Sequence, residues 1–439
     1  MRYYLRPPAC ALKCEQGLAN SSMPTIIFVV FCIVYLGMIL GGLPFLQLDR
    51  TGIALLGAIT LIGIGAVSPD EAAKSIHLPT LILLFSFMVV SAQMRLGGFY
   101  DWVTRRLAAL PLPPPLLLAA LTLVVAALSA VFSNDIVCLA VAPVLIDACR
   151  ARRLDPVPYL LALACGANVG SAATLIGNPQ NMLIGETLKL SFGGYFAQAL
   201  VPVLLGLLVT WGLITWQTRG RWSSSEFDAA RAAAPERRED AGAPLDRWQT
   251  AKGLSVAAVL LAVFLFLPAW PRDVAALTGA GLLLTSRKLH SSKMLGLVDW
   301  GLLILFIGLF VVNHALQQTG IVAGIVADFA AAGVNLGQPV ALFAATLVLS
   351  NIVSNVPAVM LLLPVAAHAL AGPTLALVST LAGNLLIVGS IANIIVVAAA
   401  ARRGIRIDWR RHARVGVPVT LATLAICAAS LWWQLPPAA

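Results

Sequence analysis

The sequence predicts an all-α polytopic membrane protein of two inverted repeats of five spans, each repeat with a re-entrant hairpin and a broken helix. Three observations predict this fold: an apolar composition, an internal repeat, and polar clusters inside apolar segments. Of the 439 residues, 59% are hydrophobic and 11% charged, whereas soluble domains carry about 25% charge. The net charge of +10 is therefore assigned to loops at a lipid bilayer, and we expect no nucleic-acid partner.

Apolar segments long enough to cross a bilayer divide the chain into domains. We expect an N-terminal tail (1–23), a first repeat (24–217), a cytoplasmic linker (218–249) and a second repeat (250–434). Met23 directly precedes the first span and is an alternative native start. The segment 98–109 predicts an amphipathic helix on the membrane surface. The expected spans are 24–46, 51–67, 79–96, 158–190, 192–217, 250–269, 273–286, 299–316, 374–401 and 412–434, and the expected hairpins are 114–150 and 338–370.

Short matches between the two halves recur in the same order at nearly constant spacing, which indicates an internal repeat. "ALLGAITLI" matches "ALTGAGLLL", and "SNDIVCLAVAPVL" matches "SNVPAVMLLLPVA". The matched residues are Gly57 with Gly279, Gly98 with Gly320, Ser133 with Ser354, and Gly170 with Gly389.

An odd number of spans turns the second half upside down in the membrane, and the basic residues test this. With both termini outside, 23 of the 29 Lys and Arg residues fall on the cytoplasmic side, as the positive-inside rule requires. We therefore expect a multi-pass protein of the cell (inner, cytoplasmic) membrane with its N- and C-termini outside.

Four polar clusters lie at membrane depth: Ser133-Asn134-Asp135, 166–181, 350–357 and 383–393. Glycine and proline let a helix stop and restart, and irregular backbone is tolerated in a membrane only when it lines a cavity or is buried in protein. A restarted helix presents N–H groups to an anion. Ser, Asn and Thr supply neutral oxygens for Na⁺ and donors for an oxyanion.

The clusters provide two overlapping sets of candidate residues. Packing and hydrogen bonding between helices is the alternative role of such Gly, Ser and Asn residues, and Asn178, Asn181 and Asn393 are equally suited to capping a restarted helix. The substrate candidates are Ser133, Asn134, Asn178, Asn181, Ser354, Asn355 and Asn393; the Na⁺ candidates are Ser133, Asn134, Asp135, Gly170, Ser354, Asn355 and Gly389.

Asp135 is the one acidic residue expected near the middle of the membrane, where a carboxylate is costly and indicates function. It would bind Na⁺, carry the coupling proton, or stay neutral through burial. The alternative is a structural carboxylate that caps the second arm of the hairpin. Its counterpart in the second half is Val356.

These residues resemble the ion-transporter superfamily, which includes citrate-transporter-like permeases, divalent-anion/sodium symporters, arsenite permeases and one family of sodium/proton antiporters. The motifs are "SND" (133–135), "GANVGSAATLIGNPQN" (166–181), "SNIVSNVPAVMLLLP" (350–364) and "GNLLIVGSIAN" (383–393). The resemblance implies an elevator-type transporter, with a scaffold that holds a homodimer. Symporters of the dicarboxylate branch carry Ser-Asn-Thr at both tips, so Ser-Asn-Asp and Ser-Asn-Val argue against a dicarboxylate here.

The leading interpretation is a secondary active transporter of a small inorganic or organic anion across the lipid bilayer, coupled to Na⁺ or H⁺. The alternative is arsenite-type efflux or Na⁺/H⁺ antiport with Asp135 as the shared cation site. An enzyme is not expected, because the chain has no His-Glu-x-x-His and no Gly-x-Ser-x-Gly. No cofactor is expected besides the coupling ion.

Overall fold

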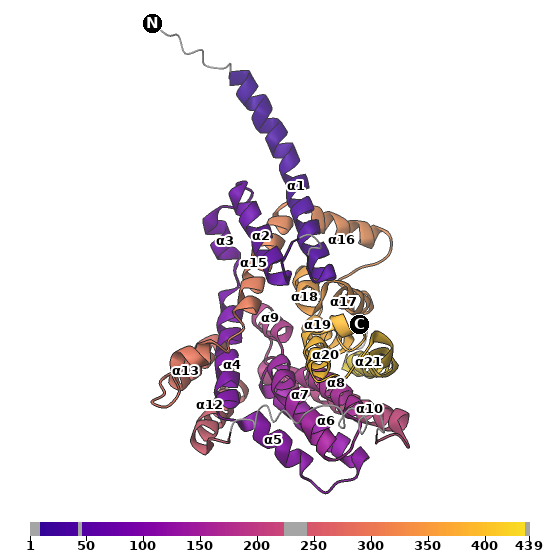
Figure 1. Cartoon of the computed structure of the whole chain (residues 1–439). Helices are drawn as coiled ribbons and strands as arrows, with labels where there is room; N and C mark the ends of the chain where they lie inside the picture. The colour runs from indigo at the N-terminus through magenta and orange to yellow at the C-terminus, as the bar shows by residue number, and fades with distance from the viewer. Residues whose placement is uncertain (1–8, 43–45, 224–243, 435–439) are drawn as a thin grey trace. The chain divides into compact units, whose positions relative to one another are not determined.

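The computed structural model describes residues 9–42, 46–223 and 244–434, with side chains from Met23 onward. Residues 1–8 of the predicted tail and 224–243 of the predicted linker lie outside this part. The described chain is helical (Figure 1), apart from one isolated bridge between Gly42 and Asp49. Seven of the described helices are long and apolar enough to cross a membrane: Met23–Leu40, Leu78–Leu96, Pro114–Val131, Phe192–Thr218, Arg247–Phe266, Trp300–Gln318 and Trp409–Gln434.

The chain divides into two compact units, and the first contains Met1–His77 and Trp300–Leu336. Its helices are α1 (Ala9–Leu40), α2 (Arg50–Gly63), α3 (Pro69–Ser75), α15 (Trp300–Gln318) and α16 (Ile321–Ala331). Helix α2 lies against α15, and α1 packs on both. The hydroxyl of Tyr35 on α1 donates to Oδ1 of Asn313 on α15 over 2.9 Å.

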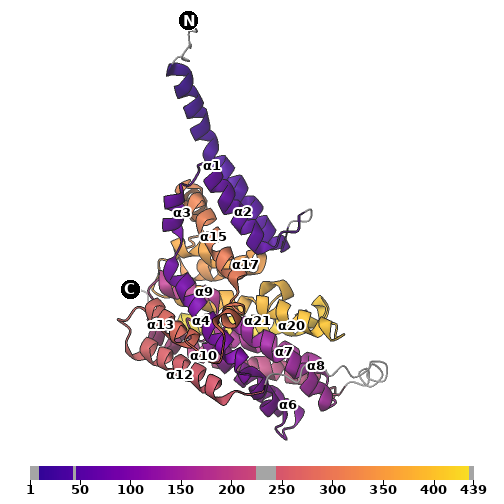
Figure 2. The same cartoon turned by 60° about the vertical axis from the view of Figure 1, so that its left-hand side comes forward.

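The second unit contains Leu78–Asp299 and Gly337–Ala439. Its α-helices are α4 (Leu78–Leu96), α5 (Phe99–Ala108), α6 (Pro114–Val131), α7 (Asn134–Ala151), α8 (Pro156–Ser171), α9 (Pro179–Thr187), α10 (Phe192–Thr218), α12 (Arg247–Phe266), α13 (Arg272–Leu284), α14 (Ser291–Leu295), α17 (Pro339–Val353), α18 (Asn355–Leu362), α19 (Ala371–Ala382), α20 (Ile391–Arg402) and α21 (Trp409–Gln434). Helix α13 lies against α4, and α12 packs on both. Helix α8 lies among α6, α7, α10 and α20 (Figure 1, Figure 2).

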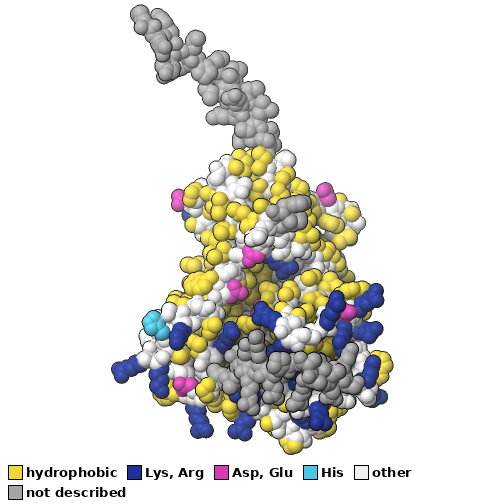
Figure 3. Space-filling model, viewed as in Figure 1, with side chains coloured by type: hydrophobic (Ala, Val, Ile, Leu, Met, Phe, Trp, Pro, Cys, Tyr) yellow, Lys and Arg dark blue, Asp and Glu magenta, His cyan; other side chains and the backbone are white. Residues whose placement is uncertain are grey.

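The surface is largely apolar, and Lys and Arg side chains gather toward the end of the second unit that carries α5 and α12 (Figure 3). The amphipathic helix predicted at 98–109 is α5. Its Arg106 guanidinium lies 5.8 Å from the ring centroid of Trp102. A basic and aromatic helix of this kind suits the polar boundary of a bilayer.

Two glycines start matching helices. Gly98 (φ 68°) precedes α5, and Gly320 (φ 75°) precedes α16. Only glycine adopts this left-handed backbone at little cost. The repeat aligns these two glycines, yet α16 itself was not among the expected elements.

Arg152 fixes the loop between α5 and α6. Its guanidinium donates to the carbonyl oxygens of Ala108, Leu110 and Leu112 over 3.1, 3.0 and 2.7 Å. Three neutral acceptors on one loop satisfy most of the donors that an arginine carries.

Gly308 permits the close crossing of α15 and α2, because a Cβ there would lie 2.6 Å from the carbonyl carbon of Ala54. Backbone cannot move aside cheaply, so we expect Gly308→Ala to lower the free energy of unfolding by about 1–3 kcal/mol. The measurement is thermal unfolding of the purified protein in detergent. Gly324→Ala on α16, where a Cβ meets nothing within 4 Å, is the matched control, and equal midpoints for both variants would contradict this account.

Candidate functional site

The structure brings all four predicted polar clusters together inside the second unit. The first hairpin turns at Phe132 and Ser133 between α6 and α7, and the second turns at Ser354 between α17 and α18. Helix α8 stops at Ser171 and α9 starts at Pro179. In the second half α19 and α20 flank a break at 383–390. Each hairpin tip lies against a broken helix.

Asn168 on α8 joins the two halves of the chain. Its side-chain oxygen accepts from Asn134 Nδ2 over 3.0 Å and from Ser390 Oγ over 2.9 Å. Its amide nitrogen donates to Asn384 Oδ1 over 2.8 Å and to Asn393 Oδ1 over 3.2 Å. An amide can make about this number of bonds, so buried Asn168 is saturated and holds one hairpin tip and the second broken helix in fixed positions.

In the second break, the carbonyl groups that lack helical partners are satisfied by side chains. Asn393 Nδ2 donates to the Gly383 and Leu386 oxygens over 2.8 and 3.1 Å. A ring nitrogen of His412 on α21 lies 3.0 Å from the Asn384 carbonyl oxygen. Because a carbonyl only accepts, this nitrogen is the donor.

The first break is satisfied in the same manner. The Tyr195 hydroxyl donates to the Ala172 oxygen over 2.6 Å, and Asn181 Nδ2 donates to the Thr174 oxygen over 3.0 Å. The side-chain oxygen of Asn178 accepts from the Asn181 backbone N–H over 2.9 Å and caps α9. Asn178 Nδ2 also donates to Thr380 Oγ1 on α19 over 3.1 Å. These bonds favour capping over ligand binding for Asn178.

Glycine at two positions allows backbone segments to meet. A Cβ on Gly170 would overlap the backbone of Ala126 on α6, and one on Gly177 would overlap the Ser171 carbonyl oxygen. The Asn134 N–H donates to the Gly177 oxygen over 3.3 Å. Gly170 therefore serves the close crossing of α6 and α8, and Gly177 lets the first break contact the first hairpin tip.

The second hairpin tip faces the second break. A Cβ on Gly383 would lie 3.3 Å from Asn355 Nδ2, and one on Gly389 would lie 3.3 Å from Asn351 Oδ1. Ser354, between α17 and α18, has φ 76° and ψ 161°, a region that is nearly exclusive to glycine. Ser133 at the first tip has ordinary values of −53° and 128°.

Several buried polar atoms near the tips have no hydrogen-bond partner among the described residues. Such atoms are costly unless something binds them. The oxygens are Ser129 Oγ and Asn134 Oδ1 in the first half, and Ser350 Oγ, Asn351 Oδ1 and Asn355 Oδ1 in the second; one donor, Asn384 Nδ2, is also unpartnered.

Asp135 lies half-buried in the first turn of α7, directly after Asn134. The four cluster segments contain no Lys or Arg. Across the described ranges no three His, Cys, Asp or Glu side chains converge as metal ligands. The site is therefore built from amides, hydroxyls and backbone, with one carboxylate beside it.

Sequence reasoning missed several residues that the structure joins to the site. Asn168 lay inside a quoted motif, but its spacing from the hairpin gives no sign that it bridges the halves. Asn384 could have been predicted as a site residue, because "GN" at 383–384 precedes the second break as "GAN" at 166–168 precedes the first. Thr380 and His412 had no distinguishing sequence context.

The comparisons with known proteins agree with this architecture. Residues 26–382 match the family model described as "Citrate transporter". An uncharacterised transporter of Mycobacterium tuberculosis is 30% identical over 413 residues, covering 88% of this chain and 94% of its own. The silicon efflux transporter LSI3 of Oryza sativa subsp. japonica is 30% identical over 477 residues, covering 93% of this chain and 98% of its own.

A solved structure shares the fold. The YdaH transporter of Alcanivorax borkumensis, whose crystal structure is described as having an unusual topology, aligns with a TM-score of 0.54 and 15% identity over 94% of this chain and 98% of its own. The fold and these relatives define a membrane transporter, which is not an enzyme. The chain belongs to the citrate transporter family, and the predicted relationship to the ion-transporter superfamily is confirmed.

Asn168→Asp tests the central amide. A carboxylate keeps both acceptors but loses the donors to Asn384 and Asn393, so we expect a loss of about 3 kcal/mol or more of unfolding free energy. The midpoint of thermal unfolding in detergent measures it. Gln317→Glu, the same chemical change at an exposed position of α15, should stay within about 0.5 kcal/mol of the parent. An equal effect of both changes would refute the assigned role.

Backbone strain at Ser354 predicts that Ser354→Gly is more stable than Ser354→Ala, by about 1–3 kcal/mol. Both variants remove the hydroxyl, and only glycine relieves the positive φ. The same pair of substitutions at Ser133, where φ is negative, should show no gain for glycine. The midpoints of thermal unfolding of the four variants measure this difference. Equal midpoints for Ser354→Gly and Ser354→Ala would contradict the assignment of backbone strain to Ser354.

Proposed function

We propose that the chain is a secondary active transporter that moves a small anion across the cytoplasmic membrane, coupled to Na⁺ or H⁺. The observation that carries this proposal is the set of unpartnered buried oxygens at both hairpin tips, within a framework of saturated amides. Protein that leaves such atoms unpaired in an apolar interior loses stability. A ligand that pairs them recovers it.

Neutral oxygens with one nearby carboxylate suit a coupling cation. In the first half, Asn134 Oδ1 lies beside Asp135, with the Ser133 turn next to it. In the second half, Asn355 Oδ1 and the Gly389 region form the corresponding group. The Gly170 carbonyl oxygen already accepts a hydrogen bond from the Ala173 N–H over 3.1 Å. Gly170 would therefore contribute to the cation site indirectly, through the close crossing of α6 and α8 that it permits.

A small anion would be bound by hydrogen-bond donors at the site. Asn384 Nδ2 is a buried amide donor that has no partner among the described residues. Helix α7 begins at the first hairpin tip and α20 begins at the second break, and their N-terminal N–H groups favour negative charge. The absence of Lys and Arg from the clusters favours a small or weakly charged solute over a multiply charged one.

The packing supports an inverted repeat with an elevator mechanism. Helices α1 and α2 pack with α15, and helices α12 and α13 pack with α4. Each trio thus combines two helices of one half with one helix of the other, as intertwined repeats would. The hairpins and broken helices would move against such trios, and the trios would hold the proposed homodimer. Both termini would lie outside.

Export is the second candidate, and one observation favours it. The rice relative matched over nearly its whole length is named a silicon efflux transporter, and the Dictyostelium discoideum relative named putative transporter arsB is 32% identical over 162 residues, or 37% of this chain. A weakly acidic oxyacid fits a site without Lys or Arg. Asp135 would then exchange a cation or proton for the exported solute.

Asp135→Asn tests the coupling site. A ligand that binds only the folded state at one hundred times its Kd adds about 2.7 kcal/mol of stability. We expect the thermal midpoint of the reconstituted protein to rise with NaCl relative to choline chloride, or to change between pH 5.5 and 8.5, and this response to vanish in Asp135→Asn. Asp70→Asn, at an exposed position of α3, is the control. If Asp135→Asn responds like the parent, Asp135 has no part in coupling.

The ion pair between Glu186 on α9 and Arg272 on α13 tests the elevator movement. Arg272 Nε lies 2.9 Å from Glu186 Oε1, and both side chains are nearly buried. A moving α9 must break this pair. We expect a Glu186→Cys, Arg272→Cys protein bridged by a thiol-specific crosslinker to lose transport, with recovery on reduction of a cleavable linker. Each single cysteine variant treated identically is the control. Full transport by the bridged protein would exclude movement between α9 and α13.

A further inference from the structure

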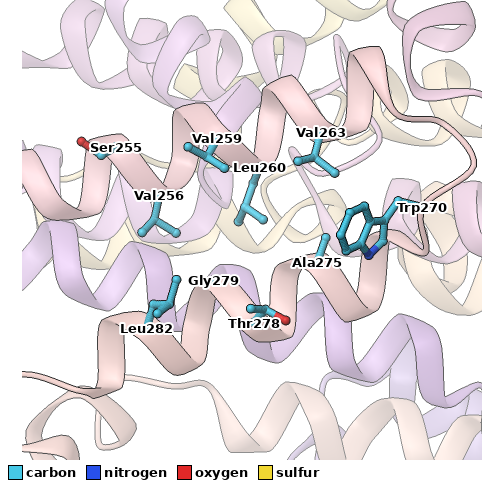
Figure 4. Close-up of a pocket in the computed structure, with 10 residues that line it drawn as sticks. All are labelled: Ser255, Val256, Val259, Leu260, Val263, Trp270, Ala275, Thr278, Gly279 and Leu282. Carbon is cyan, nitrogen blue, oxygen red and sulfur yellow. The ribbon is translucent and has the colours of Figure 1, made fainter.

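An apolar groove of about 300 Å³ runs between α12 and α13 (Figure 4). The two helices are antiparallel and joined by a short turn, and side chains from both point into the space between them. From Ser255 to Val263 the groove follows α12 for about 12 Å at the helical rise of 1.5 Å per residue. It is lined by Ser255, Val256, Val259, Leu260, Val263, Trp270, Ala275, Thr278, Gly279 and Leu282.

The floor of the groove depends on small residues of α13. A Cβ on Gly279 would lie 3.0 Å from Val256 Cγ1 and 3.2 Å from Leu260 Cδ1, so the helices meet there. Val259 and Leu282 form the rims and are 61% and 57% exposed. Helix α12 is a candidate membrane span, so the open side of the groove faces an apolar environment.

The two ends of the groove differ in chemistry. Trp270 closes the end at the turn (Figure 4). Beyond Ser255 at the other end, Lys252 Nζ lies 3.3 Å from the carbonyl oxygens of both Leu283 and Thr285. An ammonium group has three donors, so one remains for another acceptor.

Two more cations adjoin this end. Arg287 and Lys288 follow Thr285 and Ser286 in the loop after α13 and are exposed. The helix pair α1–α2, which lies 222 residues earlier in the repeat, has Val30, Gly65 and Ala66 at the positions of Lys252, Arg287 and Lys288. The basic end therefore distinguishes α12–α13 from its counterpart in the first half.

We propose that this groove binds an anionic phospholipid, with an acyl chain between α12 and α13 and the phosphate at Lys252, Arg287 and Lys288. An apolar channel that ends in three cations matches a ligand with a long apolar chain and a negative headgroup. Basic residues beside membrane helices attract anionic lipid headgroups in this way, and a groove of this volume is within the range of small-ligand sites.

The test is a titration of the delipidated protein in detergent with palmitoyl-oleoyl phosphatidylglycerol or the corresponding phosphatidylcholine, followed by thermal unfolding and by native mass spectrometry of retained lipid. We expect saturable stabilisation by phosphatidylglycerol only. Lys252→Gln, Arg287→Gln, Lys288→Gln together should raise the half-saturating concentration about tenfold or more. The control triple Arg402→Gln, Arg406→Gln, Arg414→Gln removes equal charge at exposed positions and should leave it unchanged.

A second pair of variants tests the acyl-chain groove. Thr278→Trp fills the groove from α13, whereas Leu277→Trp enlarges an exposed neighbour that does not line it. We expect only Thr278→Trp to abolish retention of phosphatidylglycerol. Three results of the titration would overturn the proposal: equal stabilisation by the two lipids, equal weakening of lipid binding in the two triple variants, or equal stabilisation by inorganic phosphate.

A second copy of the chain is the other possible occupant of the groove. If Thr278→Trp converted a dimer to a monomer whether or not lipid was present, the groove would be a dimer contact and the proposal would be wrong.

Discussion

The hydrogen bonds of Asn168 are the interaction on which the candidate site depends. Two helices are interrupted inside the second unit, and an interrupted helix releases N–H and C=O groups that lipid cannot satisfy. Asn168 takes part in four bonds that tie the first hairpin tip to the second broken helix. Asn393, Tyr195 and Asn181 pair the released carbonyl groups. The irregular backbone is stable because amides from distant parts of the chain complete it.

The asparagine side chains of the site fall into two groups according to their hydrogen bonds. Those of Asn168, Asn178 and Asn181 are hydrogen-bonded within the protein and hold other groups in position. Asn134, Asn351 and Asn355 each keep an unpaired oxygen at a hairpin tip. Unsatisfied oxygens held among fully bonded amides are what a preorganised site requires, because binding then needs little further ordering.

Much of the fold follows from the sequence, since apolar length, Gly-Pro interruptions and basic loops each have a direct physical meaning in a bilayer. Most helices lie in the expected segments, although the short helices α3, α14 and α16 do not, and both hairpin turns fall at the expected Ser-Asn pairs. The site was predicted less completely. Asn178 before Pro179 is a recognisable helix cap, but periodicity carries no information on which distant amide pairs with Asn168. Ser354 has the same neighbour as Ser133, Asn, yet only Ser354 has a positive φ, which depends on how α17 meets α18.

The loop clamp made by Arg152 has a consequence for how the α5–α6 connection tolerates sequence change. Arg152 lies at the C-terminal end of α7 and bonds to the main-chain oxygens of Ala108, Leu110 and Leu112. Because every residue type carries a main-chain oxygen, side chains in this connection can be exchanged without removing an acceptor. Insertion or deletion of a residue would instead shift the oxygens relative to the guanidinium, so the length of the connection is constrained more tightly than its composition.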